Sequence, residues 1–313
     1  MVVFQISEPL SSKFNNNIMK KLLFLLVLAC LLQIGNVFSQ PTDPTVLDGI
    51  YVKEHVPARK PVPYHHIREA DMMWTKMIWR MLDLKEKINH PLYFPINSNR
   101  IENSRYSLIS LFLESIDAGD LEVYDDDEFT VPLTISAIDE KFDAVESTTF
   151  VENPETGELI ETKVPGSRNL GEVSRLLLKE VWYFDKQRSK LEVRIVSMCP
   201  IRMAPPKKVI GEEDVSDSDE AVELTMKKMF WVYYLAVRPM LSNHEVYNTN
   251  NDAERRTFDD IFFKRRFSSY IFNETNVYEN RVISEFKKGL DALIESERIK
   301  EWMFKVEHDL WEF

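Results

Sequence analysis

The chain has 313 residues, 44% hydrophobic and 29% charged, so it is long enough and apolar enough to bury the core of at least one globular domain. Its formal net charge of −12 at pH 7 argues against broad binding to nucleic acids or anionic membranes, which requires a basic surface. The chain has only eight glycines and neither GxGxxG nor GxxxxGK[ST], so the sequence gives no indication of a nucleotide-binding loop.

Residues 1–39 have the features of an N-terminal extension followed by a signal peptide. Two lysines precede a long apolar run, and the residues just before Gln40 suit signal peptidase, so we expect cleavage between Ser39 and Gln40. A usual signal peptide would begin at Met19, which leaves open whether the start codon is Met1 or Met19. Two alternatives are a retained anchor helix and a lipoprotein cleaved before Cys30.

The mature chain is expected to begin with an extended arm at residues 40–63, because five prolines in this segment disfavour helix. Such an arm is either a flexible tail or a strap that lies on a partner. A single α+β domain is expected to follow at residues 64–313. Its expected parts are a helical segment at 64–120, a β-rich segment at 121–245 and a second helical segment at 246–313. Only Cys199 remains after cleavage, so no internal disulfide can form.

The segment 67–89 is predicted to be a long helix that ends before a His-Pro pair. Placed at helical spacing, most of its large apolar residues fall on one broad face, which we expect to face the core. Met72, Trp79 and Leu82 fall outside that face, on a separate narrow strip. Either another element of the same chain covers this strip, or it binds a partner, since Trp and Met are enriched at such surfaces.

The middle of the chain favours a second helix followed by strands. The helix is predicted at 105–117, with Ala118-Gly119 as its C-terminal cap. A short strand or turn with an acidic cluster at 125–128 is expected after it. The predicted strands are 181–184 and 191–198, joined by a polar turn, and the continuous apolar run 230–237 as a central strand. The segment 205–220 is expected to be an exposed loop, acidic in its second half.

The C-terminal part is predicted to be helical at 250–272 and 279–304, where apolar residues recur at helical spacing. The predicted fold class is therefore α+β, with N- and C-terminal helical segments around a small, mainly antiparallel sheet. Residues 71–129 and 259–313 also share short motifs in the same order. Either they descend from a duplication, or two amphipathic helices resemble each other by chance.

Motifs that carry chemistry are scarce. His65, His66 and Glu69 have the right residue types for a metal site, but HExxH is absent and the sequence nearby offers no further ligand. Cys199 lies in a strand-like apolar context and is expected to be a buried structural thiol. We therefore expect no cofactor and no metal. The alternative is a periplasmic hydrolase or metal-binding protein that uses the two histidines and Glu69.

One basic cluster stands beside aromatic residues. Lys264, Arg265 and Arg266 lie between Phe263 and Phe267. They are a candidate docking surface for an acidic partner or for a neighbouring copy of the chain. The alternative is a solvated helix face with one or two internal ion pairs.

Four long segments resemble the GldN/PorN family of gliding-motility and type IX secretion proteins. They are YHHIREADMMWTKMIWRMLDLKEKINHPLYFP, LKEVWYFDKQRSKLEVRI, NDAERRTFDDIFFKRRFSSYI and GLDALIESERIKEWMFKVEHDLWEF. The resemblance covers nearly all of the mature chain, about residues 50–313. The N-terminal extension departs from the family pattern, which puts only the start codon in doubt.

The resemblance implies an exported, non-enzymatic protein of the periplasm, associated with the inner face of the outer membrane. It implies a ring complex with an outer-membrane lipoprotein of the GldK/PorK type, self-association in that ring, and contact with the periplasmic part of a GldM/PorM-type motor protein. No catalytic residue is carried over. On this basis, Met72, Trp79, Leu82 and the basic cluster are the candidate interface residues.

Overall fold

The computed structural model describes residues 20–21, 58–96, 105–144, 147–152, 159–164, 166–205, 224–248, 251 and 253–310. The chain divides into two compact units, residues 1–53 and 54–313, and the strands and helices described below belong to the second. The expected cleavage site and nearly all of the expected loop at 205–220 lie outside the described residues. Within them, no helix combines the length and the apolar character that crossing a bilayer requires.

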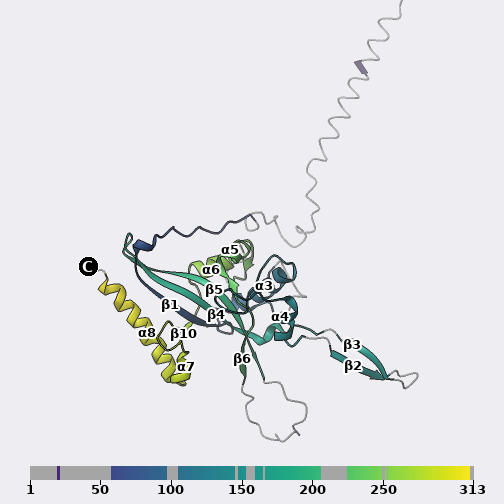
Figure 1. Ribbon diagram of the computed structural model, residues 1–313. Coiled ribbons are helices and arrows are strands. Elements are labelled where there is room, and N and C mark those ends of the chain that lie inside the picture. The colour runs from purple at the N-terminus through teal and green to yellow at the C-terminus, as the bar shows by residue number, and fades with distance from the viewer. Residues whose placement is uncertain are drawn as a thin grey trace, which may run out of the picture. The chain divides into compact units, whose positions relative to one another are not determined.

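The described part of the 54–313 unit is built on an antiparallel sheet of six strands in the order β10-β1-β4-β5-β6, with β7 also paired to β5 (Figure 1). The strands are β1 (Met72–Asp83), β4 (Val173–Asp185), β5 (Lys190–Ala204), β6 (Thr225–Lys228), β7 (Val232–Tyr233) and β10 (Tyr270–Glu274). β1 pairs with β4 on one side and with β10 on the other. Helices and an antiparallel sheet together confirm the predicted α+β class.

β1 replaces the helix predicted at 67–89, which was wrong. A short 3-10 helix, η3 (Glu69–Asp71), precedes the strand, and a four-residue helix, α2 (His90–Tyr93), follows it. From Ile78 to Leu82 every side chain is buried, because both faces of this part of the strand are covered. A strand buried on both faces has a continuous apolar sequence, which periodicity alone does not distinguish from a buried helix.

The hairpin of β4 and β5 confirms the strands predicted at 181–184 and 191–198 and extends both of them. The central strand predicted at 230–237 is wrong, because only β7 is extended there and the chain then enters helix α5 (Tyr234–Asn243). Tyr234, Val237 and Leu241 are buried at spacings of three and four residues. The apolar run therefore serves a helix face rather than a strand.

Four short helices supply much of the main core. They are α3 (Leu108–Asp117), α4 (Ile135–Lys141), α5 and α6 (Phe258–Phe263). Their apolar side chains join those of β1 and β4 in one cluster that includes Leu82, Leu178, Phe112 and Phe262. α3 confirms the helix predicted at 105–117. It begins with a capping box in which the hydroxyl groups and backbone N–H groups of Ser107 and Ser110 pair reciprocally.

The C-terminal segment is only partly helical. Among the described residues of the predicted helix 250–272, only α6 is helical. The chain then turns at Arg265, whose φ is 52°, and returns as β10. The helix predicted at 279–304 is confirmed in part, as α7 (Ile283–Phe286) and α8 (Leu290–Asp309). α8 runs beside β10 (Figure 1), where Ile299 and Met303 join a cluster with Ile78 of β1.

The remaining elements are small, and the structure of residues 71–129 differs from that of residues 259–313 at the start of each segment. β2 (Ser147–Glu152) pairs with β3 (Leu159–Val164), β8 (Glu245–Val246) pairs with β9 (Arg256–Thr257), and η5 (Leu170–Glu172) precedes β4. The two supposed copies begin differently, since the residues after Asp71 form the strand β1, whereas Asp259 lies in the helix α6. The hypothesis of a repeat is therefore wrong.

Candidate interaction surfaces

Met72, Trp79 and Leu82 do not form the exposed strip that a helix would have given them. Met72 is 40% exposed at the start of β1, whereas Trp79 is 8% exposed and Leu82 is fully buried. The indole N–H of Trp79 donates to Asp127 at 3.2 Å, and Leu82 belongs to the main core. Trp79 and Leu82 are three residues apart, so their side chains point to opposite faces of the strand, and Met72 lies at its exposed start. Of the three, Met72 alone stays available to a partner.

The acidic cluster that follows α3 is used within the chain. Asp125 pairs with Lys141, and Asp127 pairs with Lys179 at 3.0 Å. Asp126 accepts hydrogen bonds from the Thr130 hydroxyl and from two backbone N–H groups, and these bonds hold the pKa of its carboxyl below the ordinary value. This segment therefore closes its own turn rather than presenting three free carboxylates.

Arg265 is an internal residue of the fold. Its guanidinium donates to both oxygens of Glu180, at 2.8 and 3.2 Å, and the Glu180 carboxylate is fully buried. Trp182 donates a third hydrogen bond to Glu180, at 3.0 Å. Arg80 lies near this pair and donates to Ser269, and burial lowers the pKa of Arg80. Arg265 therefore forms an internal ion pair, and its role in docking stays a prediction.

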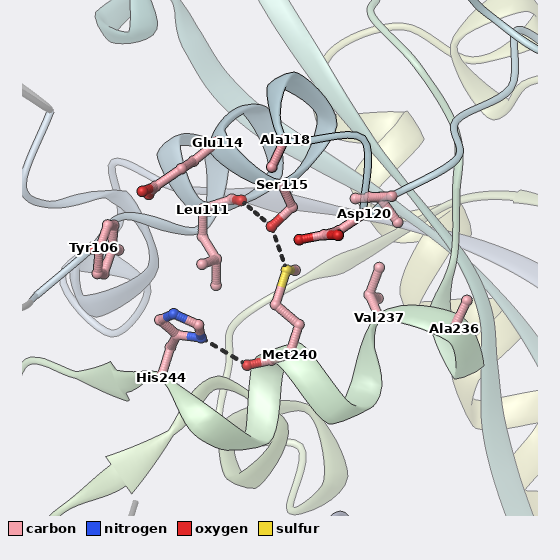
Figure 2. A pocket seen from close by; sticks show the side chains of 11 residues that line it. Tyr106, Leu111, Glu114, Ser115, Ala118, Asp120, Ala236, Val237, Met240 and His244 are labelled. Atoms are coloured by element: carbon pink, nitrogen blue, oxygen red, sulfur yellow. Dashed lines mark hydrogen bonds between the residues drawn. The ribbon is translucent and has the colours of Figure 1, made fainter. Parts of the chain in front are cut away.

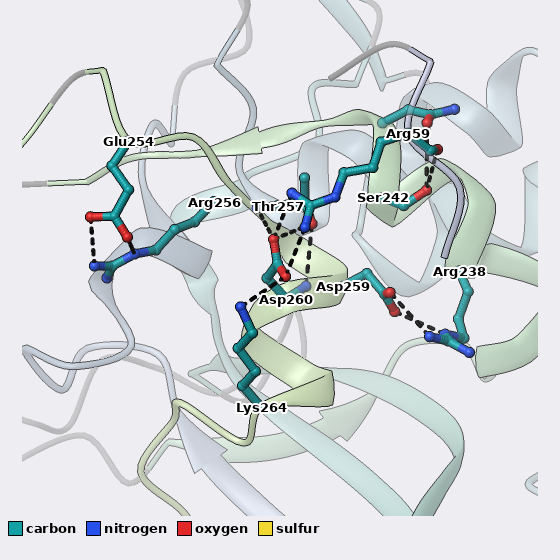
Figure 3. A network of polar contacts seen from close by, with 10 residues as sticks. Arg59, Arg238, Ser242, Glu254, Arg256, Thr257, Asp259, Asp260 and Lys264 are labelled. Carbon is teal, nitrogen blue, oxygen red and sulfur yellow. Dashed lines mark hydrogen bonds and ion pairs between the residues drawn. The ribbon is translucent and has the colours of Figure 1, made fainter. Parts of the chain in front are cut away.

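Lys264 and Arg266 remain on the surface, on either side of the inward-pointing Arg265. The Lys264 ammonium lies 3.3 Å from Asp260, which also pairs with Arg59 at 2.9 Å (Figure 3). Burial alone would raise the pKa of Asp260, but a hydrogen bond from the Thr257 backbone N–H and the two cations together lower it. For Lys264 and Arg266, the docking role stays a prediction.

A buried ion pair joins α5 to α6. Arg238 donates to both oxygens of Asp259, at 2.9 and 3.1 Å (Figure 3). The Tyr234 hydroxyl also donates to Asp259, at 3.1 Å. Burial is the main cause of the raised pKa of Tyr234. The Arg238 guanidinium also lies over the ring of Tyr64, at 4.5 Å from its centroid. The extended segment that leads to β1 is thereby held on the domain.

α8 has two apolar stripes, of which the sheet covers one. Ser296, Ile299 and Met303 face the sheet and are at most 5% exposed. On the rest of the helix surface, four large apolar side chains are each at least half exposed. We call these four the α8 outer surface: Leu290 (72%), Leu293 (50%), Ile294 (57%) and Phe304 (68%). The helical spacing of the sequence had already placed Leu290, Leu293 and Ile294 on an apolar helix face. It could not show that a different set of side chains, Ser296, Ile299 and Met303, packs against the sheet.

A pocket of about 340 Å³ lies between α3 and α5, and we call it the α3–α5 pocket (Figure 2). Met240 extends from α5 toward α3, and its sulfur lies 2.7 Å from the Ser115 hydroxyl. The imidazole of His244 is held by its Nδ1, 2.8 Å from the Met240 carbonyl oxygen. The exposed residues Glu114 and Asp120 border the pocket. Sequence reasoning did not find this pocket, because Ser115 and Met240, which meet across it, are 125 positions apart in the chain.

The residues proposed for the alternative metal site lie apart from any ligand cluster. His65, His66 and Glu69 are exposed, and the described parts of the chain contain no group of three His, Cys, Asp or Glu side chains able to hold a metal ion. Cys199 is fully buried, as predicted, and burial raises the pKa of its thiol to about 12. Such a thiol is a poor nucleophile and a poor metal ligand.

These features define an α+β protein with exposed apolar side chains on α8 and a pocket between α3 and α5. The family model for "Gliding motility associated protein GldN" matches residues 67–312, which is most of the chain. The chain therefore belongs to the GldN family, a structural family of the gliding-motility and type IX secretion machinery. No curated protein matches the chain.

Proposed function

We propose that this protein is a non-enzymatic structural subunit of the type IX secretion and gliding machinery. It is exported to the periplasm by its signal peptide, forms a ring with an outer-membrane lipoprotein of the GldK/PorK type, and links that ring to the periplasmic part of a GldM/PorM-type motor protein. The family match and the surface of α8 support this function.

The α8 outer surface is the observation that carries the proposal. α8 is 20 residues long, and Ile299 and Met303 of its inner stripe already pack against Ile78 and Ile271 of the sheet. Leu290 and Phe304 mark the two ends of the outer stripe and are the most exposed of its four residues. Grouped apolar side chains on a surface indicate a protein or membrane contact. The acidic net charge disfavours a membrane, so we assign this surface to the lipoprotein.

A pair of aspartate substitutions in α8 tests this assignment. In the variant with Ile294→Asp and Phe304→Asp, we expect binding to the soluble part of the lipoprotein to weaken by at least about 100-fold, because two buried charges would face an apolar partner surface. Both side chains are half exposed or more, so the melting temperature should stay close to that of the unaltered protein. Calorimetric titration of the purified proteins measures the affinity.

A matched control uses apolar residues exposed elsewhere. Val131 lies just before α4 and is 53% exposed, and Ile135 is the first residue of α4 and is 45% exposed. Changing both to Asp should leave lipoprotein binding unchanged. Unaltered binding by the α8 variant would show that this surface is not the contact. Absence of any complex between the unaltered protein and the lipoprotein or motor domain would contradict the proposed function itself.

A further inference from the structure

The α3–α5 pocket combines an apolar interior with a negative border. Leu111, Val237 and Met240 line its interior, and the carboxylates of Glu114 and Asp120 stand at its edge. Within the described residues, neither carboxylate forms an ion pair with a lysine or arginine. A pocket with these properties suits an apolar side chain that has cations beside it, because the cations would neutralise the border while the apolar group fills the interior.

The end of α6 supplies a group of that chemistry. Phe263 is 43% exposed, the Lys264 side chain is 53% exposed, and Arg266 is also exposed. We call these three residues the α6 knob. The left-handed backbone at Arg265 turns that side chain inward to Glu180 and leaves its two basic neighbours outside. Within the described residues, Arg266 forms no ion pair.

The pocket and the knob lie on opposite sides of α5. Met240 faces the pocket, whereas Arg238, two residues earlier and therefore on the far side of the helix, lies 5.6 Å from the ring centroid of Phe263. Because α5 lies between them, the α6 knob of a chain does not reach the α3–α5 pocket of the same chain. Two copies joined through these surfaces would be arranged head to tail, which generates a ring or a filament rather than a closed two-fold dimer.

We propose that the α6 knob of one copy docks into the α3–α5 pocket of the next copy. Phe263 enters the apolar interior, Arg266 pairs with the carboxylates of Glu114 and Asp120, and Lys264, whose ammonium also lies 3.3 Å from Asp260, adds positive charge beside them. Charge complementarity favours a second copy as the occupant, because a chain with a net charge of −12 repels its own copies unless patches of opposite sign meet. The inference rests on the proposed ring function and names the surfaces through which the subunits of the ring meet.

Charge reversal on both sides tests the contact in the full chain. Reversing the knob (Lys264→Glu with Arg266→Glu) or the pocket (Glu114→Lys with Asp120→Lys) should each weaken self-association by at least about tenfold, because like charges would then meet. The variant with all four reversals should associate again, since the pairs are restored with opposite signs. Light scattering over a range of protein concentrations gives the mass of the assembly, and its association should weaken with added salt.

Two further measurements distinguish this contact from a general effect of surface charge. Reversing Glu285 and Asp291, two exposed acidic residues of α7 and α8, should leave self-association unchanged. Both two-site variants should still bind the lipoprotein through α8. Loss of that binding would assign the altered surface to the lipoprotein rather than to a second copy, and would overturn the inference but not the proposed function. The inference would be overturned if the unaltered protein were monomeric at every concentration. It would also be overturned if reversing one side abolished association and the variant with all four reversals did not restore it.

Discussion

At the scale of single residues, adjacent arginines with the same chemistry have different roles. Arg265 points inward and satisfies the buried carboxylate of Glu180, whereas Arg266 stays on the surface. The cause is the backbone at Arg265, which has a φ of 52° and ends α6. A charged cluster in a sequence therefore does not identify a docking surface until the direction of each side chain is known.

We expect Arg265→Ala to lower the free energy of unfolding by about 3 kcal/mol, because it leaves the buried Glu180 carboxylate without its cation. Arg266→Ala should change stability by less than about 0.5 kcal/mol, as an exposed position does. Guanidinium denaturation of both variants makes the comparison. Replacing both Arg265 and Glu180 by leucine should lower the free energy of unfolding by less than Arg265→Ala does. Equal stability of the Arg265→Ala and Arg266→Ala variants would contradict the assigned ion pair.

At the scale of elements, the junction of α8 with the sheet depends on one polar contact inside an apolar cluster. The backbone N–H of Ile271 in β10 donates to the Ser296 hydroxyl at 2.8 Å, next to the register shift between β1 and β10. Ser296 is 4% exposed, so water does not readily replace its hydroxyl. This contact fixes where α8 meets the sheet edge, and so determines which of its stripes faces outward.

We expect Ser296→Ala to lower the free energy of unfolding by about 1–2 kcal/mol, because the N–H of Ile271 would lose its acceptor in a buried position. Ser284→Ala in the exposed part of α7 is the matched control and should have little effect. Hydrogen exchange provides the local measurement, in which the amide of Ile271 should exchange faster in the Ser296 variant. Unchanged exchange at that amide would show that the serine does not hold the helix in place.

Local sequence signals were sufficient for the hairpin and for α3, because a polar turn and a helix cap specify those elements by themselves. They failed for β1, where burial on both faces removed the alternation that identifies a strand. The pairing of β1 with β10 joins residues about 190 positions apart, and no short window contains both partners. The α3–α5 pocket was missed for the same reason, since it exists only after α3 and α5 meet.

At the scale of the whole molecule, the folded unit begins earlier than the family match. The match starts at residue 67, but the compact unit starts at Glu54. Between them, Arg59 pairs with Asp260, and Tyr64 lies against Phe263 and under the guanidinium groups of Arg194 and Arg238. The end of the predicted proline-rich arm and the residues just after it are therefore part of the domain surface around α5 and α6.

Comparing residues 54–313 with residues 67–313 tests the contribution of this segment. Removing residues 54–66 deletes the Arg59 ion pair and both cation–π contacts of Tyr64, which together contribute about 2 kcal/mol. The shorter chain should therefore melt about 5 °C lower, as expected for a protein of this size. Tyr64→Ala in the longer chain should reproduce most of that loss. Equal melting temperatures for the two chains would mean that the segment rests on the domain without stabilising it, and the domain would then begin at residue 67.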